Sequence, residues 1–196
     1  MDSSITSIGG NEDRVILSSE TTEPSSTLRY VRSALKPKHL TWLSRMPSFI
    51  SIDSLFFACH GSPRSDTEYL FWNVRSSGAV LRSQEEMTEM VTEVDATIIL
   101  CAHDHVPNST VLPNGTLVVN PGSVGLQAFL DDTPYRHVMQ NRSPHARYAL
   151  VNENEDHWRV EHREVSYDWA AASTLADANG RSDWAYWLST GKVGPD

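Results

Sequence analysis

Two histidines, His103 and His105, lie two residues apart directly after the apolar run at residues 97–100. In an extended chain, side chains at positions i and i+2 point to the same side, so a strand ending here would direct both rings into one small volume. Imidazole is the commonest metal ligand that proteins supply. Two histidines at this spacing also occur by chance on solvated loops, so the pair needs support from the rest of the chain.

Other polar residues follow predicted strands in the same way. They are Asn11, Glu12 and Asp13 after a short strand at residues 5–8, His60 after 55–59, and Asn120 after 117–119. In open α/β sheets the functional crevice lies beyond the carboxyl ends of the strands, so we expect these side chains to gather at one edge. Carboxylate, amide and imidazole groups together favour a borderline divalent ion such as Mn, Fe, Zn or Ni over Ca.

The elements that must position these residues alternate between helix and strand. Apolar spacing predicts helices at 28–35, at 37–46 and behind a capping box formed by Ser83 and Glu86. Near the C-terminus we expect a hairpin of 147–151 with 158–165, a helix at 169–178 capped by Asp168, and a short helix capped by Asp183. We predict a loop at residues 130–145. The alternation of helices and strands predicts one α/β domain with a mixed sheet.

Composition narrows the function classes. The chain has 196 residues, a formal net charge of −9 and 21% charged residues, and it carries no basic stripe, so a nucleic-acid-binding surface is not expected. There is no apolar run long enough for a membrane helix, and no signal peptide is visible at the N-terminus. Two cysteines, Cys59 and Cys101, form no disulfide framework and are expected to be buried. We therefore expect a cytoplasmic protein.

The motifs resemble those of the calcineurin-like metallophosphoesterases, taken in chain order. The family motifs Gly-Asn-His-Asp, His-Gly and Gly-His-x-His have counterparts in Gly10-Asn11-Glu12-Asp13, His60-Gly61 and Ala102-His103-Asp104-His105. Asn120-Pro121-Gly122-Ser123 matches the Asn-Pro-Gly-Ser turn of the bacterial phosphodiesterase-like branch. The resemblance covers nearly the whole chain and implies a calcineurin-like αββα sandwich with mixed sheets.

The resemblance also implies two divalent metal ions, which orient a phosphate ester and generate a hydroxide at neutral pH. It assigns Asn11, His60 and His103 to one ion and His105 to the other. Residues 62–78 and 130–145 are the segments expected to determine specificity.

The resemblance places Glu12 and Asp13 at catalytic positions. Glu12 stands where many family members have a histidine that assists the leaving oxygen, and Asp13 would orient that neighbour. An ionised glutamate would repel a phosphate, so Glu12 could serve as an acid only if burial raised its pKa. A solvated or structural carboxylate is the plainer interpretation of Glu12.

Two motifs of the resembled family, Asp-x-His and Gly-Asp-x-x-Asp, do not occur ahead of Ile5. We therefore expect residues 1–196 to form a single metallophosphoesterase domain that lacks its first two strand–helix units, with at most one ion well held. An exposed sheet edge would then favour an oligomer or a partner that covers it.

The sequence predicts a metal-dependent phosphoesterase that acts on phosphodiesters or phosphomonoesters, impaired by its missing ligands. The alternative is a non-catalytic protein-interaction module on the same scaffold, like the retromer subunit of this fold. The missing ligands and Glu12 favour the alternative, and the surviving ligand motifs favour the enzyme.

Overall fold

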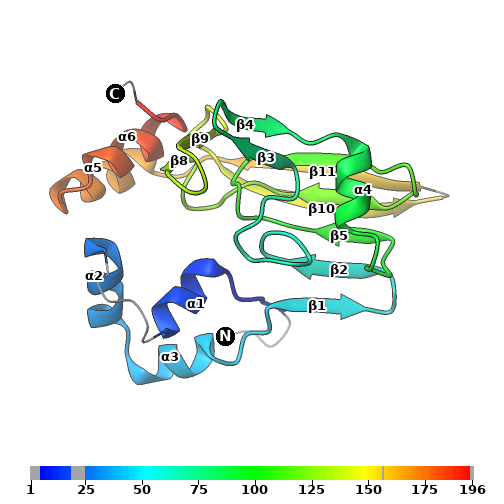
Figure 1. The fold of residues 1–196 in the computed structure, drawn as a ribbon. Helices are drawn as coiled ribbons and strands as arrows, with labels where there is room; N and C mark the ends of the chain where they lie inside the picture. The colour runs from blue at the N-terminus through cyan, green and yellow to red at the C-terminus, as the bar shows by residue number, and fades with distance from the viewer. Residues whose placement is uncertain (1–4, 19–24, 156, 195–196) are drawn as a thin grey trace.

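A computed structural model gives the structure of the chain and describes residues 5–18, 25–155 and 157–194. Its centre is a five-stranded sheet in the order β1-β2-β5-β7-β6 (Figure 1). The strands are β1 (Phe49–Ile52), β2 (Phe56–Cys59), β5 (Ile98–Leu100), β6 (Asn108–Val111) and β7 (Leu117–Asn120). The central strands β2, β5 and β7 are parallel, whereas β1 and β6 run antiparallel to their neighbours at the two edges. The predicted mixed α/β fold is confirmed.

Both faces of the sheet are covered, so its central strands alternate between two cores. Ile99 and Val118 point to the core beneath α4 (Gln84–Met90), and both are fully buried. Ile98 and Val119 point to the opposite core, which is closed by the hairpin of β10 (Ala146–Asn154) and β11 (His157–Val165). Figure 1 shows α4 on one side of the sheet and this hairpin on the other. The predicted hairpin is therefore one of the three layers.

Helix α4 starts as the sequence predicts. The Ser83 hydroxyl accepts the Glu86 N–H at 3.2 Å, and the Glu86 carboxylate accepts the Ser83 N–H at 2.8 Å. These reciprocal bonds satisfy two of the N–H groups that a helix start leaves without intrahelical partners. Met87 and Met90 then pack on the sheet from one helix face.

Two short hairpins lie beside the sheet. β8 (Ala128–Asp131) and β9 (His137–Gln140) pair with each other and overlap the segment 130–145 predicted to be a loop, so the prediction is wrong for residues 130–131 and 137–140. β3 (Trp72–Arg75) and β4 (Gly78–Leu81) form the second hairpin, which the sequence does not predict. All four strands have only four residues and are partly exposed, and runs this short carry little periodic signal.

The N-terminal part of the described chain is helical. The strand predicted at residues 5–8 is absent, because Gly9 N–H donates to the Pro47 carbonyl at 2.9 Å and the segment joins no sheet. The predicted turn after it is instead the first turn of α1 (Asn11–Leu17), followed by α2 (Ser26–Ala34) and α3 (Pro37–Leu43). The helices predicted at 28–35 and 37–46 correspond to α2 and α3.

The chain ends in α5 (Trp169–Ala178) and α6 (Ser182–Thr190). Asp168 caps α5 as predicted, since its carboxylate accepts the Ala171 N–H at 2.9 Å. Asp183 does not cap α6, because it lies in the first turn and pairs with Arg181. None of the helices in the described ranges combines the length and the apolar character that crossing a bilayer requires.

Candidate metal centre and adjoining cavity

His103 and His105 lie in a loop beyond β5. Both have positive φ, +67° for His103 and +62° for His105, so the extended geometry predicted for the pair is wrong. Side chains other than glycine occupy this region at a cost of about 1–2 kcal/mol each. Local bonds hold the conformation: Asp104 N–H donates to the Ala102 carbonyl at 2.8 Å, and the Asp104 carboxylate accepts the Val106 N–H at 2.8 Å.

Asn120, the last residue of β7, fixes this loop to the neighbouring strand. Its Nδ2 donates to the Ala102 carbonyl at 2.9 Å, and its Oδ1 accepts the Gly122 N–H at 2.9 Å. On the other side, Ala102 N–H donates to the His60 carbonyl at 2.8 Å. Both polar ends of the buried Asn120 amide are therefore used to shape the loop.

Asn11 and His60 meet although they are far apart in the sequence. Asn11 Oδ1 lies 2.9 Å from His60 Nε2, and Asn11 Nδ2 donates to Glu12 Oε1 at 3.3 Å. A Cβ atom at Gly10 would lie only 2.8 Å from His60 Cε1, so the bare backbone of Gly10 is what lets the ring approach α1. Glycine at this position is thus part of the site.

His103 reaches this pair from the loop after β5. The ring centroids of His60 and His103 are 5.0 Å apart, and Tyr69 lies 4.9 Å from His103 on the other side. His105 turns toward Phe129, with ring centroids 4.8 Å apart. Its buried Nδ1 has no hydrogen-bond partner within the described residues. The structure therefore brings Asn11, His60 and His103 together and places His105 beside them in a separate environment.

Burial keeps the imidazoles of the site neutral. It lowers the pKa of His103 to about 4, with smaller effects from His60 and His105, and it lowers the pKa of His105 to about 4. Burial also lowers the pKa of His60, opposed by the charges of Asp66 and Asp13. A neutral imidazole offers the lone pair that a metal ion requires. The nearby carboxyl of Asp104 has its pKa raised to about 7 by its own burial.

The two carboxylates predicted at catalytic positions have different surroundings. Asp13 accepts the Gly10 N–H at 2.9 Å and so caps α1. Glu12 is exposed, and its Oε1 accepts the Asn11 Nδ2 at 3.3 Å. In this structure Glu12 and Asp13 both shape the position of Asn11.

One pair of the predicted metal ligands, Asn11 and His60, lies close enough to share an ion. His60 Nε2–H donates to Asn11 Oδ1 at 2.9 Å, a separation close to the roughly 3 Å expected between two ligand atoms of one ion at right angles. No group of three or more His, Cys, Asp or Glu side chains placed to hold a metal occurs in the described part of the chain. The assignment of one ion to Asn11, His60 and His103 therefore stays a prediction.

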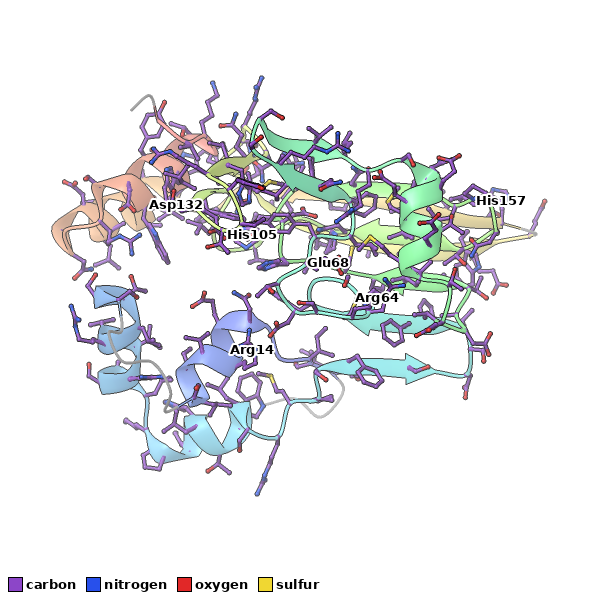
Figure 2. The ribbon with its side chains drawn as sticks, in the orientation of Figure 1. Arg14, Arg64, Glu68, His105, Asp132 and His157 are labelled. Atoms are coloured by element: carbon purple, nitrogen blue, oxygen red, sulfur yellow. The ribbon has the colours of Figure 1, made fainter. Side chains whose placement is uncertain are left out.

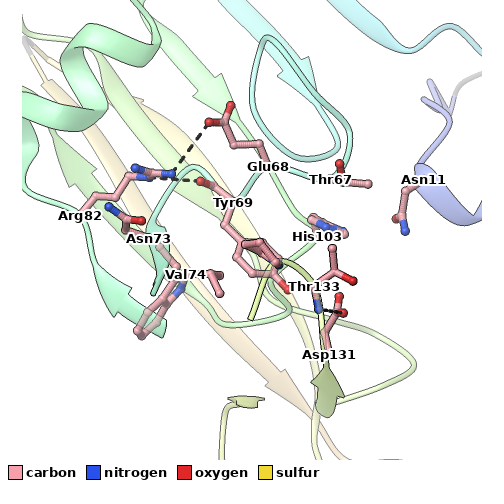
Figure 3. Close-up of a pocket in the computed structure, with 12 residues that line it drawn as sticks. Asn11, Thr67, Glu68, Tyr69, Asn73, Val74, Arg82, His103, Asp131 and Thr133 are labelled. Carbon is pink, nitrogen blue, oxygen red and sulfur yellow. Dashed lines mark hydrogen bonds and ion pairs between the residues drawn. The ribbon is translucent and has the colours of Figure 1, made fainter. Parts of the chain in front are cut away.

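A cavity of about 540 Å³ opens beside His103 (Figure 3). Its walls come from both segments that the sequence assigns to specificity, and also from Asn11 and Arg82. The lining residues are Asn11, Thr67, Glu68, Tyr69, Trp72, Asn73, Val74, Arg82, His103, Asp131, Thr133 and Pro134. This volume lies in the range of small-molecule sites.

Tyr69 lines the cavity, and its hydroxyl contacts the buried His137. Its hydroxyl lies 3.0 Å from His137 Nε2, and His137 Nδ1 lies 2.7 Å from the Tyr135 carbonyl. Because a carbonyl only accepts, Nδ1 carries the proton and Nε2 accepts from the Tyr69 hydroxyl. Tyr69 and Asp131 belong to no motif and lie only within the two predicted specificity segments, and Arg82 lies outside both, so the sequence gives no signal for it.

Comparisons with known proteins support the fold of this scaffold. A metallophosphoesterase from Sphaerobacter thermophilus superposes with a TM-score of 0.67 at 20% identity, over 94% of this chain and 75% of that one. Two structures of Vps29 from Entamoeba histolytica, one a single-site variant and one the wild type with zinc, are also similar. They have TM-scores of 0.35 and 0.32 at 14% identity, over 68% and 61% of this chain and 79% and 62% of theirs.

No family model and no curated protein sequence matches the chain. The TM-score of 0.67 to the Sphaerobacter protein shows that the chain has the metallophosphoesterase fold. The calcineurin-like architecture expected from the motifs is thereby confirmed at the level of the fold.

Proposed function

We propose that this chain is a metal-dependent phosphoesterase that hydrolyses phosphodiesters or phosphomonoesters with one divalent ion, Mn, Fe, Zn or Ni. The observation that carries the proposal is the convergence of Asn11, His60 and His103 from three separate elements, with Asn11 and His103 lining a cavity of small-molecule size. When bound, such an ion supplies a hydroxide at neutral pH and offsets phosphate charge.

The chain's own residues would do the following work. His60 and His103 are buried and neutral, so neither has a proton to lose to solvent before it binds an ion. Because an amide oxygen only accepts, His60 Nε2 carries the ring proton in its contact with Asn11 Oδ1, and an ion there would require that proton to move to Nδ1. Glu12 holds the Asn11 amide in the orientation that points its oxygen at His60. We expect the activity to be weak, because residues 1–196 lack the two carboxylate motifs of the resembled family. His105, assigned by resemblance to a second ion, has an unused buried nitrogen.

The decisive experiment compares His103→Ala with His157→Ala. His157 is exposed on the β10–β11 hairpin, far from His105 (Figure 2). With Mn and bis(4-nitrophenyl) phosphate, we expect His103→Ala to lose turnover by at least about 100-fold, since even indirect support of a ligand is worth 10–100-fold. His157→Ala should behave as wild type. Turnover that survives His103→Ala, or a purified chain with neither metal nor turnover, would reject the proposal.

A non-catalytic interaction module is the second candidate, and the edge of the sheet favours it. Within the described residues β1 pairs on one side only, it contains no charge or proline, and Phe49 and Ile52 are 54% and 46% exposed. Such an edge is open to pairing with another chain. This function predicts a concentration-dependent molar mass or a bound partner, together with no metal uptake in elemental analysis.

A further inference from the structure

The cavity beside His103 has two chemically different ends. Figure 3 shows Asn11 and His103 at one end and Arg82 and Asn73 at the other, with Tyr69 between them. The first end would face the phosphate of a substrate. The second end is therefore placed to meet the organic part of the ester, and its chemistry can identify that part.

Arg82 is a largely buried cation whose contacts are long. Its side chain is only 16% exposed, its Nη2 lies 3.9 Å from Glu68 Oε1, and its Nε donates to the Tyr69 carbonyl at 3.4 Å. A guanidinium carries five N–H donors, and a buried charge is stable only when it is well paired. Glu68 pairs only weakly with the Arg82 guanidinium, because its Oε1 stays 3.9 Å away while its Oε2 accepts the Ser62 hydroxyl at 2.6 Å. An acceptor-rich group in the cavity would complete the contacts of Arg82.

The backbone holds Arg82 in place for this task. Arg82 N–H donates to the carbonyl of Phe71 at 2.9 Å, one step beyond the β3–β4 ladder, and Phe71 is 2% exposed in the core. A binding group is effective when a packed element fixes it before the ligand arrives. Trp72 and Val74, from the same hairpin, line the cavity with apolar surface.

We infer that the cavity selects phosphate esters whose alcohol carries a second anionic group, a carboxylate or a phosphate, which pairs with Arg82 beside Asn73. Trp72 and Val74 would contact the carbon skeleton between the two anionic ends. Two acidic residues oppose an anion here: Glu68, held by Ser62 and Arg82, and Asp131, at the His103 end. Guanidinium groups pair with carboxylates and phosphates through parallel N–H bonds, which gives the preference its geometric basis. The inference rests on the proposed function for its substrate, but not for the anion site itself.

Turnover tests the selectivity with a matched pair of esters. 4-Carboxyphenyl phosphate and 4-carbamoylphenyl phosphate differ in charge at the distal end, and phosphate release with Mn measures both. We expect wild type to favour the carboxylate by about tenfold or more in kcat/KM, chiefly through KM, because a hydrogen-bonded charge pair is worth that much. Arg82→Gln should shrink the ratio to about twofold or less. Arg75→Gln, on an exposed residue of the same hairpin, should retain it.

A metal-free binding experiment separates the inference from the proposed function. With EDTA present, titration calorimetry compares 4-hydroxybenzoate, 4-hydroxyphenylphosphonate and 4-hydroxybenzamide. We expect at least one of the two anions to bind about tenfold or more tightly than the amide, and the tighter one identifies carboxylate or phosphate as the natural group. Arg82→Gln should abolish this difference, whereas Arg82→Lys, which keeps the charge, should preserve part of it.

The outcomes are distinct. Equal affinity for anions and amide in wild type overturns the inference, whatever the turnover assay gives. An anion preference that persists in Arg82→Gln overturns it as well. An Arg82-dependent preference without turnover of any ester supports the anion site and rejects the phosphoesterase.

Discussion

The candidate metal centre joins two regions that are built differently. His60 and His103 follow strands β2 and β5, whose residues are packed between two covered faces of the sheet. Asn11 begins α1, a helix of seven residues with no buried residue. Side-chain hydrogen bonds connect α1 to the sheet side of the site, from Asn11 to His60 and from Arg14 to Asp66.

This contrast predicts which donors are already in position before a ligand binds. Main-chain bonds and Asn120 lock the His103 loop, so the imidazoles keep their places when the site is empty of any ligand. The Asn11 amide depends on a few side-chain contacts at the surface. Loss of stability and loss of metal affinity should therefore follow from different substitutions.

The largest effect on stability should come from the sheet. Ile99→Ala removes a fully buried side chain from the core beneath α4, and we expect the free energy of unfolding to fall by about 2–5 kcal/mol. Leu17→Ala on α1, where the side chain is 41% exposed, should change it by less than about 1 kcal/mol. Urea denaturation measures both. Equal losses would show that α1 is as integral to the fold as the sheet.

Acidification should lower the stability of the sheet side of the site, because that side contains two buried imidazoles. As pH falls from about 6.5 to about 4, unfolded chains protonate His103 and His105 while folded chains do not, so folding becomes weaker. The Asp104 carboxyl opposes this, because its pKa of about 7 lets the folded chain take up a proton first. Urea denaturation with EDTA should show the acid loss, and Asp104→Asn should steepen it. If Asp104→Asn leaves the pH dependence of stability unchanged, Asp104 does not have the raised pKa described above.

At the junction of the two regions, Gly10→Ala should weaken metal binding by about tenfold. The new methyl would lie 2.8 Å from His60 Cε1, so either the ring or α1 must shift and the Asn11–His60 spacing is lost. Gly9→Ala is the matched control, since its nearest contact would be a comfortable 3.8 Å. Manganese titration calorimetry measures both. A Gly10→Ala variant that binds manganese as well as wild type would remove Asn11 from the donor set.

The contrast between the regions also explains which features the sequence predicts. The buried central strands and the capping box of α4 carry strong periodic and chemical signals, and both form as expected. The strand predicted at residues 5–8 does not form, because a strand needs a neighbour and this segment joins no sheet. The positive φ of His103 and His105 is not predicted by their spacing, since it depends on the Asp104 turn between them and on a tertiary bond from Asn120 to Ala102.

The smallest effect should come from the surface ion pair that ties α1 to the sheet side. Arg14 Nε and Nη2 reach the Asp66 carboxylate at 2.7 and 3.0 Å, yet the two side chains are 58% and 26% exposed. Solvent and salt screen such pairs, so Arg14→Gln should lower the free energy of unfolding by about 1 kcal/mol or less. Arg159→Gln, which disrupts an exposed pair on the hairpin, should have a similarly small effect on stability and none on metal affinity. If Arg14→Gln alone weakens manganese binding a few-fold, the ion pair positions Asn11; if neither variant does, the Asn11–His60 contact holds α1 without it.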